Sequence, residues 1–505
     1  MGILSITLIV LFVVFWWQDF KAIYKKHGSF ISFSGSYKFR ETLYFILLIV
    51  FSFAFVNLSG LGGSLNGSDS LLIASSVILS FLISLVWYLY LRRLDHFEKE
   101  PLLIIFITFV LGAIFSFFVF PISNFVQTEF NFFLNGEVWN DWWYCVFGIG
   151  MVEEIVKIIP FIIILKFTKQ VNEPFDYIVY GSVSALGFAF IENTMYLYNS
   201  NLSAIYGRAL FSSVAHMFDT SIITYGLIYL KHAKINLRGF QWIILLLLAS
   251  FAHGFYDFWL INDAMNEYYF LTIFFYLLSI YLWVTMNNNL LNISPFYNLQ
   301  KSINLKRIKY RIINLLLTVF FSAYMVSFLL YSKQAAYYVL FHSLQLNGFV
   351  LLFLAFNLSN MEFIKGHIGN VEFKNRMAFI LPRIHSDDKH SGSRVLLFIH
   401  ENTHMRRGKE GLRASFPFKA TLLRRVSYQG NTNCYLIKLD EEFKEKWRVA
   451  PSYVIKLISK EDVLFGKNPR PMVLYGIKNE ATIETGYIPD QDFIFIHETS
   501  GMKII

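Results

Sequence analysis

Long apolar runs recur through the first 360 residues of the chain, separated by short polar connections. Most contain about 20 residues, which is enough for an α-helix to cross a hydrocarbon core of about 30 Å. The pattern predicts a polytopic α-helical membrane protein. We expect about eleven transmembrane helices, near residues 3–17, 42–58, 71–91, 102–120, 142–166, 178–199, 209–230, 240–261, 268–285, 312–331 and 335–357.

The pattern changes after about Met361. Short alternating or apolar runs, typical of β-strands, are separated there by polar connections rich in Gly, Pro and Asn. We therefore expect a C-terminal β-rich soluble domain over 361–505, with one helix near Asp440–Trp447. The runs that predict strands are Arg394–Ile399, Thr421–Val426, Tyr435–Leu439, Tyr453–Ile458, Met472–Tyr475 and Phe493–Ile496.

The composition is also that of a membrane protein. Of the 505 residues, 55% are hydrophobic, 19% aromatic and only 16% charged, which differs from the average of soluble proteins. The two cysteines, Cys145 and Cys434, are far apart in the sequence, so neither a disulfide framework nor a cysteine-based metal site is expected. The first run, Ile3–Trp17, lacks a basic start and a small-residue cleavage site, and we interpret it as a retained span.

Basic residues are concentrated in every second loop between the predicted spans, whereas the intervening loops contain none or only Arg208. Cytoplasmic loops carry this excess of Lys and Arg. The alternation predicts an N-terminus outside and a cytoplasmic C-terminal region. The net charge of +9 therefore reflects the basic cytoplasmic loops, which face membrane lipids, and no nucleic-acid partner is expected. The basic loops hold Lys21, Lys25, Lys26, Lys38 and Arg40, then Arg92, Arg93 and Lys99, then Lys166 and Lys169, then Lys231, Lys234 and Arg238, and finally Lys301, Lys306, Arg307, Lys309 and Arg311.

Ionisable side chains are concentrated on four consecutive predicted spans. Charged groups inside a span are costly, and they usually face the bundle interior or a water-filled cavity. Glu153, Glu192, His216 and His253 lie at a similar distance from the outer end of their helices, on the order of 10–17 Å deep at ~1.5 Å per residue. This shared depth predicts one site. The candidate residues are Glu153, Glu154 and Lys157, Glu192 and Asn193, His216 and Asp219, and His253 and Asp257.

These residue types suit hydrolysis. A carboxylate in a cavity of low dielectric can act as a general base on water, and a histidine can stabilise an oxyanion or protonate a leaving amine. Alternatively, His216, His253 and Glu192 could bind zinc and leave one position open for water. Asp257, one turn beyond His253, would then orient that imidazole. No serine, cysteine or threonine is similarly placed beside a base, which disfavours a covalent mechanism.

Two other interpretations of the buried charges are open. Single polar residues in a membrane bundle often serve as structural hydrogen-bond partners. An ion- or proton-coupled transporter would also line its path with Asp, Glu and His. The sequence shows no repeated half and no pair of Gly/Pro-broken helices, and the predicted site lies off the midplane. These features disfavour transport, which we keep as the alternative to hydrolysis.

Around these residues the sequence resembles the PrsW family of intramembrane proteases, which is distantly similar to the CAAX-prenyl endopeptidase superfamily. The resemblance spans about residues 80–285. It rests on the loop Leu94–Pro101 (LDHFEKEP), on an EExxK pattern, on an FxxxEN pattern and on two histidine helices in the expected order. The matching residues are Glu153, Glu154 and Lys157, then Phe188, Glu192 and Asn193, then His216, His253 and Asp257.

The resemblance implies hydrolysis of a peptide bond, with Glu153, Glu154, Glu192, His216 and His253 as the catalytic set and with or without zinc. It implies a bacterial inner membrane and a membrane-spanning substrate of the anti-sigma-factor type, cut near the outer leaflet in a signalling step. It also divides the chain into extra helices over 1–70, a protease core over 71–290, an extra helix pair over 291–360 and the cytoplasmic domain over 361–505.

A competing site lies in the polar C-terminal region. His400, Glu401 and His404 fit the HExxH signature, in which a helix presents two histidines to zinc. The preceding run Arg394–Ile399 is strand-like, and Asn402 and Thr403 are poor helix formers. We expect a chance match, and a cytoplasmic zinc protease is the second alternative.

Overall fold

The computed structural model describes residues 13–361, except 15, 19, 22, 23, 25–28, 66, 67, 236, 238, 297–304 and 360, and beyond them six strand segments. The chain divides into two compact units. One contains the helices up to Leu290 and from Leu305 to Met361, and the other contains the strands. Each unit is described by itself.

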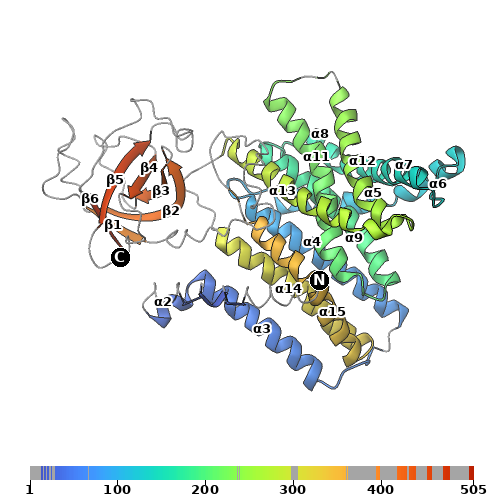
Figure 1. Cartoon of the computed structure of the whole chain (residues 1–505), viewed down its shortest axis with the longest axis horizontal. Coiled ribbons are helices and arrows are strands. Elements are labelled where there is room, and N and C mark those ends of the chain that lie inside the picture. Colours follow the sequence, from blue (N-terminus) through green and yellow to red (C-terminus); the bar gives the residue numbers. More distant parts are fainter. Residues whose placement is uncertain are drawn as a thin grey trace. The chain divides into compact units, whose positions relative to one another are not determined.

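The helical unit consists of long α-helices joined by short connections (Figure 1). Its elements are α2 (Phe30–Ser34), α3 (Tyr37–Leu58), α4 (Asp69–Leu94), α5 (Leu102–Ser116), α6 (Val119–Phe130), α7 (Val138–Trp143), η1 (Tyr144–Gly150), α8 (Met151–Phe167), α9 (Pro174–Asn199), α10 (Ile205–Gly207), η2 (Arg208–Ser212), α11 (Ser213–His232), α12 (Phe240–Ile261), η3 (Asn266–Tyr268), α13 (Phe270–Asn292), α14 (Leu305–Leu330) and α15 (Lys333–Asn357).

Seven helical segments among the described residues are long and apolar enough to cross a membrane, so the prediction of eleven spans is not supported. The predicted span at 142–166 is divided between η1 and the 17-residue α8, which carries two glutamates and two lysines. Its charged side chains lower its apolar character. The predicted span at 3–17 lies mostly outside the described residues. The seven segments are Tyr37–Leu58, Asp69–Leu94, Leu102–Phe130, Pro174–Asn199, Phe240–Ile261, Asn266–Asn292 and Arg307–Leu330.

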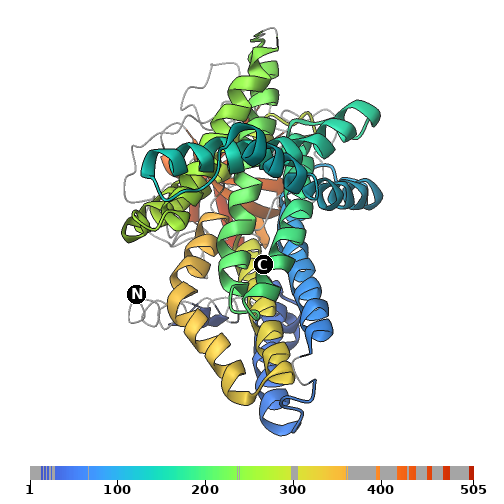
Figure 2. The same cartoon turned by 90° about the vertical axis from the view of Figure 1, so that its right-hand side faces the viewer.

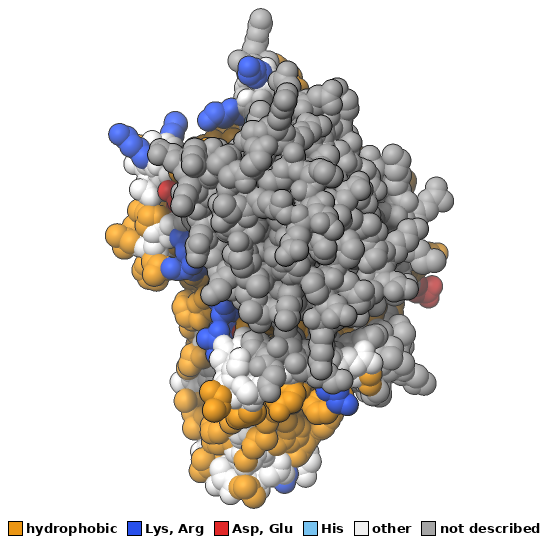
Figure 3. Space-filling model, turned by 90° about the vertical axis from the view of Figure 1, so that its left-hand side faces the viewer, with side chains coloured by type: hydrophobic (Ala, Val, Ile, Leu, Met, Phe, Trp, Pro, Cys, Tyr) orange, Lys and Arg blue, Asp and Glu red, His pale blue; other side chains and the backbone are white. Residues whose placement is uncertain are grey.

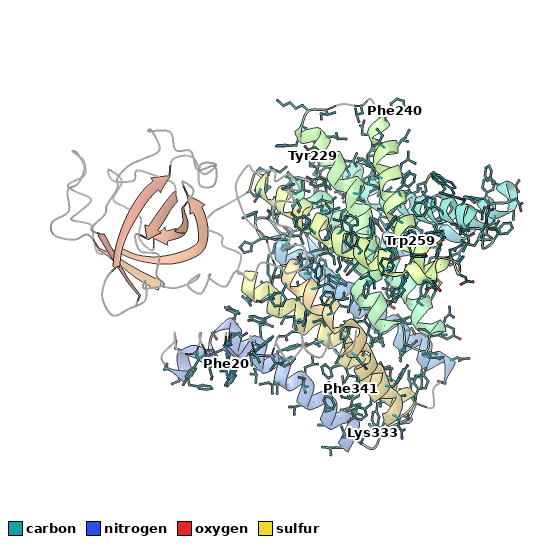
Figure 4. All side chains as sticks on the ribbon, in the orientation of Figure 1. Phe20, Tyr229, Phe240, Trp259, Lys333 and Phe341 are labelled. Carbon is teal, nitrogen blue, oxygen red and sulfur yellow. The ribbon has the colours of Figure 1, made fainter. Side chains whose placement is uncertain are left out.

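The outer faces of these helices are apolar. Large side chains such as Phe106 on α5 and Leu248 on α12 are exposed, and hydrophobic side chains cover much of the helical surface that Figure 3 shows. Trp259 on α12 packs against Trp142 and Tyr268, toward the opposite end of α12 from Phe240 (Figure 4). Exposed apolar faces and aromatic clusters near helix ends are typical of membrane-spanning helices.

Helix α9 forms the centre of the helical unit, where it packs against α4, α5, α8 and α11 (Figures 1 and 2). Small residues allow this close packing. A Cβ added at Gly187 would lie 2.1 Å from the backbone oxygen of Phe109, and one added at Gly112 would lie 2.3 Å from that of Ser184. The backbones of α5 and α9 therefore touch, as small residues permit in membrane helix pairs. Because α9 contacts so many helices, its C-terminal half can place polar groups next to residues of α8 and α11.

The second unit contains six antiparallel strands that close into a barrel in the order β1-β2-β3-β4-β5-β6. Strand β1 pairs with both β2 and β6, which closes the barrel. A register shift interrupts the β2–β3 ladder between Leu422 and Arg424. The strands are β1 (Arg394–Phe398), β2 (Phe418–Tyr428), β3 (Asn431–Leu439), β4 (Ser452–Leu457), β5 (Arg470–Ile477) and β6 (Ser500–Ile504). The predicted helix at Asp440–Trp447 and the run Phe493–Ile496 lie outside the described residues.

An acidic cluster joins the α4–α5 loop to the start of α9. Asp95 accepts a hydrogen bond from the backbone N–H of Glu100 (3.1 Å), and Tyr180 on α9 donates its hydroxyl to Glu100. Burial raises the pKa of Asp95 to about 7, and its acidic neighbours Glu98, Glu100 and Glu173 act in the same direction. Burial also raises the pKa of Glu100. The folded chain therefore binds a proton at Asp95 more tightly than an unfolded chain would.

This proton makes the stability of the helical unit depend on pH. Because the pKa of Asp95 is higher in the folded state, the free energy of unfolding should fall as pH rises from about 4 to about 7, and stay low above that. Asp95→Asn should therefore raise the unfolding temperature at pH 8 by more than at pH 5, as measured by thermal unfolding in detergent. Asp69→Asn, at an exposed position on α4, is the control. An equal effect of Asp95→Asn at both pH values would contradict the assignment.

Candidate active site

The first part of the site is a buried ion triplet on α8. Lys157 follows Glu153 by four residues and Glu154 by three, so its side chain lies on the same face of the helix as each of them. The Lys157 Nζ atom lies 2.9 Å from Glu153 Oε2 and 2.9 Å from Glu154 Oε1. The side chains of Lys157 and Glu154 are completely buried, whereas that of Glu153 is 12% exposed. One ammonium group thus pairs with two carboxylates, and one of those carboxylates remains accessible.

His253 on α12 joins this triplet. Its Nδ1 atom lies 3.0 Å from Glu154 Oε1, and its Nε2 atom lies 3.5 Å from Glu153 Oε2. Asp257, one turn further along α12, places Oδ2 3.3 Å from the same Nε2. Asp219 on α11 is at 3.9 Å from Nδ1. His253 therefore lies among four carboxylates from three helices, and both of its ring nitrogens face oxygen atoms.

His216 on α11 also contacts the triplet. Its Nδ1 atom is 2.8 Å from Lys157 Nζ, and its Nε2 atom is 2.6 Å from Glu192 Oε2 on α9. Because an ammonium group can only donate, Nδ1 must accept, and the proton of a neutral ring is on Nε2. The two histidine rings have centroids 5.6 Å apart. His216 thus connects the α8 triplet to Glu192.

All nine membrane residues named from the sequence belong to this network, although they come from four helices. Asn193 takes part through Arg208 and Ser213 rather than through the glutamates. The side chains of Glu153, Glu192 and Asp257 are 12%, 18% and 21% exposed, so they mark the accessible side of the site. The HExxH sequence, His400, Glu401 and His404, lies outside the described residues.

Two further residues of the network were not singled out by the sequence. Thr220 donates its hydroxyl to Glu154 Oε2 at 2.8 Å. It follows His216 by one helical turn, and this spacing could have identified it. Arg208 places Nη2 2.6 Å from Glu192 Oε2. In the sequence, Arg208 is the single basic residue of a predicted outer loop. That position bears on membrane topology and does not indicate a functional site.

Comparison with known proteins agrees with this geometry. A family model described as "PrsW family intramembrane metalloprotease" matches residues 100–284, which contain every residue of the network. The chain is 32% identical over 232 residues to "Protease PrsW" of Clostridioides difficile, covering 45% of this chain and 92% of that protein. The chain belongs to the PrsW family.

Other PrsW proteins extend the comparison. "Protease PrsW" of Bacillus subtilis is 30% identical over 206 residues, which cover 40% of this chain and 86% of that protein. That of Geobacillus kaustophilus is 30% identical over 187 residues, covering 37% of this chain and 79% of its own length. No solved structure matches the chain. The chain is an intramembrane protease in its helical unit, and more than half of its length lies outside each of these matches.

The donor set of the site fits the metal that the PrsW family description implies. Two groups have ligand atoms within 4.8 Å of one another: Glu153 with His216 and His253, and Glu154 with Asp219 and His253. The first offers two imidazole nitrogens and a carboxylate oxygen, which is the set of a catalytic zinc site with one open position. The carboxylate that lies with both histidines is Glu153. The sequence had suggested Glu192, which instead contacts His216 Nε2 and Arg208.

The backbone brings α8 and α12 together. A π-helical segment, η1, precedes α8 and packs against α12. A Cβ added at Gly254 would lie 2.7 Å from Val146 Cα, and one added at Gly150 would lie 2.7 Å from the backbone oxygen of Ser250. Gly254 directly follows His253, so this contact sets how closely His253 approaches Glu154. A second π-helical segment, η2, precedes α11 in the same way. Such segments are frequent at functional sites.

A methyl group at Gly254 should therefore separate the two helices. We expect Gly254→Ala to lower the rate of proteolysis by 10-fold or more, because a displacement of about 1 Å in an active site can cost on the order of 10²-fold. Gly35→Ala is the control, since its added Cβ meets only Ser32 O at 3.6 Å. The measurement is the initial cleavage rate in liposomes. An unchanged rate for Gly254→Ala would show that this contact does not set the site geometry.

Proposed function

We propose that this protein hydrolyses a peptide bond of a membrane-tethered protein near the outer leaflet, using the site formed by α8, α9, α11 and α12. The observation that supports this most is the pair of glutamates on α8, which contact a histidine from α12 and share one lysine. A partly exposed carboxylate beside a histidine is the arrangement that general acid–base hydrolysis requires.

Glu153 is the proposed general base. It is the α8 carboxylate with an accessible side chain, and it is grouped with both histidines. It takes a proton from water as the water oxygen attacks the scissile carbonyl carbon. His253 Nε2, at 3.5 Å from Glu153 Oε2, delivers a proton to the leaving nitrogen when the C–N bond breaks, and it is reprotonated by Glu153. The products are a carboxylic acid and an amine, which exchange a proton to become a carboxylate and an ammonium group, and the site returns to its starting state.

The other residues hold these two groups in place. Glu154 is completely buried and accepts from Thr220 and Lys157, so it orients His253 through Nδ1 rather than meeting water. Lys157 contacts both glutamates and offsets part of their charge. In the alternative with zinc, Glu153, His216 and His253 would hold the metal instead of carrying protons, and the metal would supply a Lewis acid for the developing oxyanion.

The remaining features of the chain complete the proposal. The alternation of Lys and Arg between loops supports an N-terminus outside and a C-terminal region in the cytoplasm. The PrsW relatives support a bacterial inner membrane. Helices α8 and α11 also cross the membrane despite their charges, because these charges pair within the bundle. Residues 71–290 form the protease core, 1–70 and 291–360 add helices, and 361–505 form a cytoplasmic domain. The substrate is a membrane-spanning protein of the anti-sigma-factor type.

Substitution of the site residues tests the reaction. Glu153→Gln, Glu154→Gln, Glu192→Gln and His253→Ala should each lower cleavage of a tagged single-span membrane protein by at least about 10²-fold. An amide at position 153 cannot accept the proton of water, an amide at 154 or 192 no longer accepts as a carboxylate from its histidine, and alanine at 253 cannot protonate the leaving nitrogen. The assay is the release of the external tag in liposomes containing the purified protein. Glu267→Gln, at an exposed glutamate of the same unit, should retain full activity, as should Glu401→Gln and His404→Ala.

Two outcomes would contradict this proposal. Full cleavage by all four variants, with loss of activity in Glu401→Gln, would transfer the function to the C-terminal region. Uptake that depends on an ion gradient, without proteolysis, would identify a transporter.

The orientation is tested separately. A reporter enzyme fused after Ile505 should be active in the cytoplasm, and one inserted near Glu137 should be active outside, because Lys and Arg mark the cytoplasmic loops. The assay uses a phosphatase that is active only outside and a fluorescent protein that folds only inside. A cytoplasmic Glu137 would invert the model and move the site to the inner leaflet.

A further inference from the structure

Arg208 is the second cation of the site, and it contacts three residues of α9. Its Nη2 atom is 2.6 Å from Glu192 Oε2, and its Nε donates to Asn193 Oδ1 at 2.5 Å. The guanidinium carbon lies 4.3 Å from the ring centre of Tyr196, one turn beyond Glu192 on α9. Arg208 therefore uses its hydrogen-bonding edge and its flat face on three neighbours from a single helix.

A closed ring of hydrogen bonds holds Arg208 in this position. Its Nε donates to Asn193, the Asn193 amide donates to Ser213 Oγ at 3.1 Å, and the Ser213 hydroxyl donates to the backbone oxygen of Arg208 at 2.8 Å. Asn193 and Ser213 are completely buried. This ring joins the π-helical segment η2 to α9, and it gives Asn193 a definite part in the site although it touches no glutamate of α8.

Glu192 connects Arg208 to His216. The same oxygen, Oε2, contacts both Arg208 Nη2 and His216 Nε2 at 2.6 Å. The shared oxygen requires the proton of His216 on Nε2 and leaves Nδ1 facing Lys157 and the α8 carboxylates. A carboxylate that fixes the tautomer and ring orientation of a histidine in this way is common around catalytic and metal-binding histidines.

We propose that Arg208 is a positioning residue of the protease, which fixes Glu192 and thereby the tautomer and orientation of His216. This inference rests on the proposed function for its effect on proteolysis, but its structural part does not. Because Nη2 and Nε contact protein atoms and the guanidinium faces Tyr196, Arg208 acts through Glu192 rather than on the substrate. Glu192 then has an orienting part, and the general base is Glu153.

Kinetics of Arg208 variants test this role. Arg208→Ala should lower kcat by roughly 10–100-fold, the usual cost of removing a group that orients a ligand histidine, with KM changed less than about 3-fold. Added guanidinium ion should restore part of the lost rate in Arg208→Ala and none in His216→Ala. Arg208→Lys, which keeps the charge without the planar fork, should lie between wild type and Arg208→Ala.

The matched control is Arg311→Ala. Arg311 also pairs with a glutamate of the helical unit, since its Nη1 is 3.8 Å from Glu41 Oε2, but it belongs to α14 and touches no residue of the site. This variant should keep wild-type kinetics. A raised KM with unchanged kcat in Arg208→Ala would mean that Arg208 binds substrate, and it would overturn the proposal.

A measurement without substrate separates this inference from the proposed function. Nitrogen NMR of protein labelled with ¹⁵N-histidine should show, among the signals of the 12 histidines, a ring protonated on Nε2 that is assigned to His216 by its loss in His216→Ala. Arg208→Ala and Asn193→Ala should convert this signal to a mixture of tautomers, whereas Arg311→Ala should not. An unchanged signal in Arg208→Ala would refute the positioning role. Absence of proteolysis in the wild type, with the tautomer change intact, would refute only the proposed function.

Discussion

The buried ammonium of Lys157 is the interaction on which the site depends. Two glutamates at consecutive positions of one helix could not remain together inside a membrane bundle as free carboxylates, because an unpaired buried charge costs several kcal/mol. Lys157 contacts Glu153, Glu154 and His216, so a single cation joins α8 to α11. His253 then attaches α12 to the same two carboxylates, and Glu192 attaches α9 through His216.

The network therefore links acidic and basic side chains across four helices. Arg208 meets Glu192, Glu192 meets His216, His216 meets Lys157, and Lys157 meets the glutamates that face His253. Such an arrangement is stable in a low-dielectric interior only when every member has a partner. The same requirement makes the site rigid, because the loss of one member leaves its neighbour as an unpaired buried charge.

Close backbone packing makes this network possible. Side chains of ordinary length reach one another only because the helices approach through small residues. Gly254 and Gly150 bring η1 against α12, and Gly187 and Gly112 bring α5 against α9. The two π-helical segments lie directly before α8 and α11, so each changes the rotation of a helix just before its functional residues. The chemistry of the site thus depends on positions that carry no functional group.

The sequence by itself determined that this is a multi-pass membrane protein, and it identified the nine polar residues that meet in the site. Ionisable groups inside apolar helices are costly, so their mere presence on four consecutive spans indicated that they pair with one another. The predicted number of spans is not supported: eleven were predicted, and seven described helical segments meet the length and hydropathy of a span, partly because the charges of α8 make that helix less apolar.

Only the tertiary structure decided which groups pair. Helical spacing could place Lys157 beside Glu153, because both lie on one helix. It could not show that Glu153, rather than Glu192, lies with both histidines, that Arg208 holds Glu192, or that Thr220 donates to Glu154. Those contacts depend on the rotation and approach of separate helices, which are set by glycine contacts and π-helical turns between residues distant in sequence. Local periodicity contains no information about such distances.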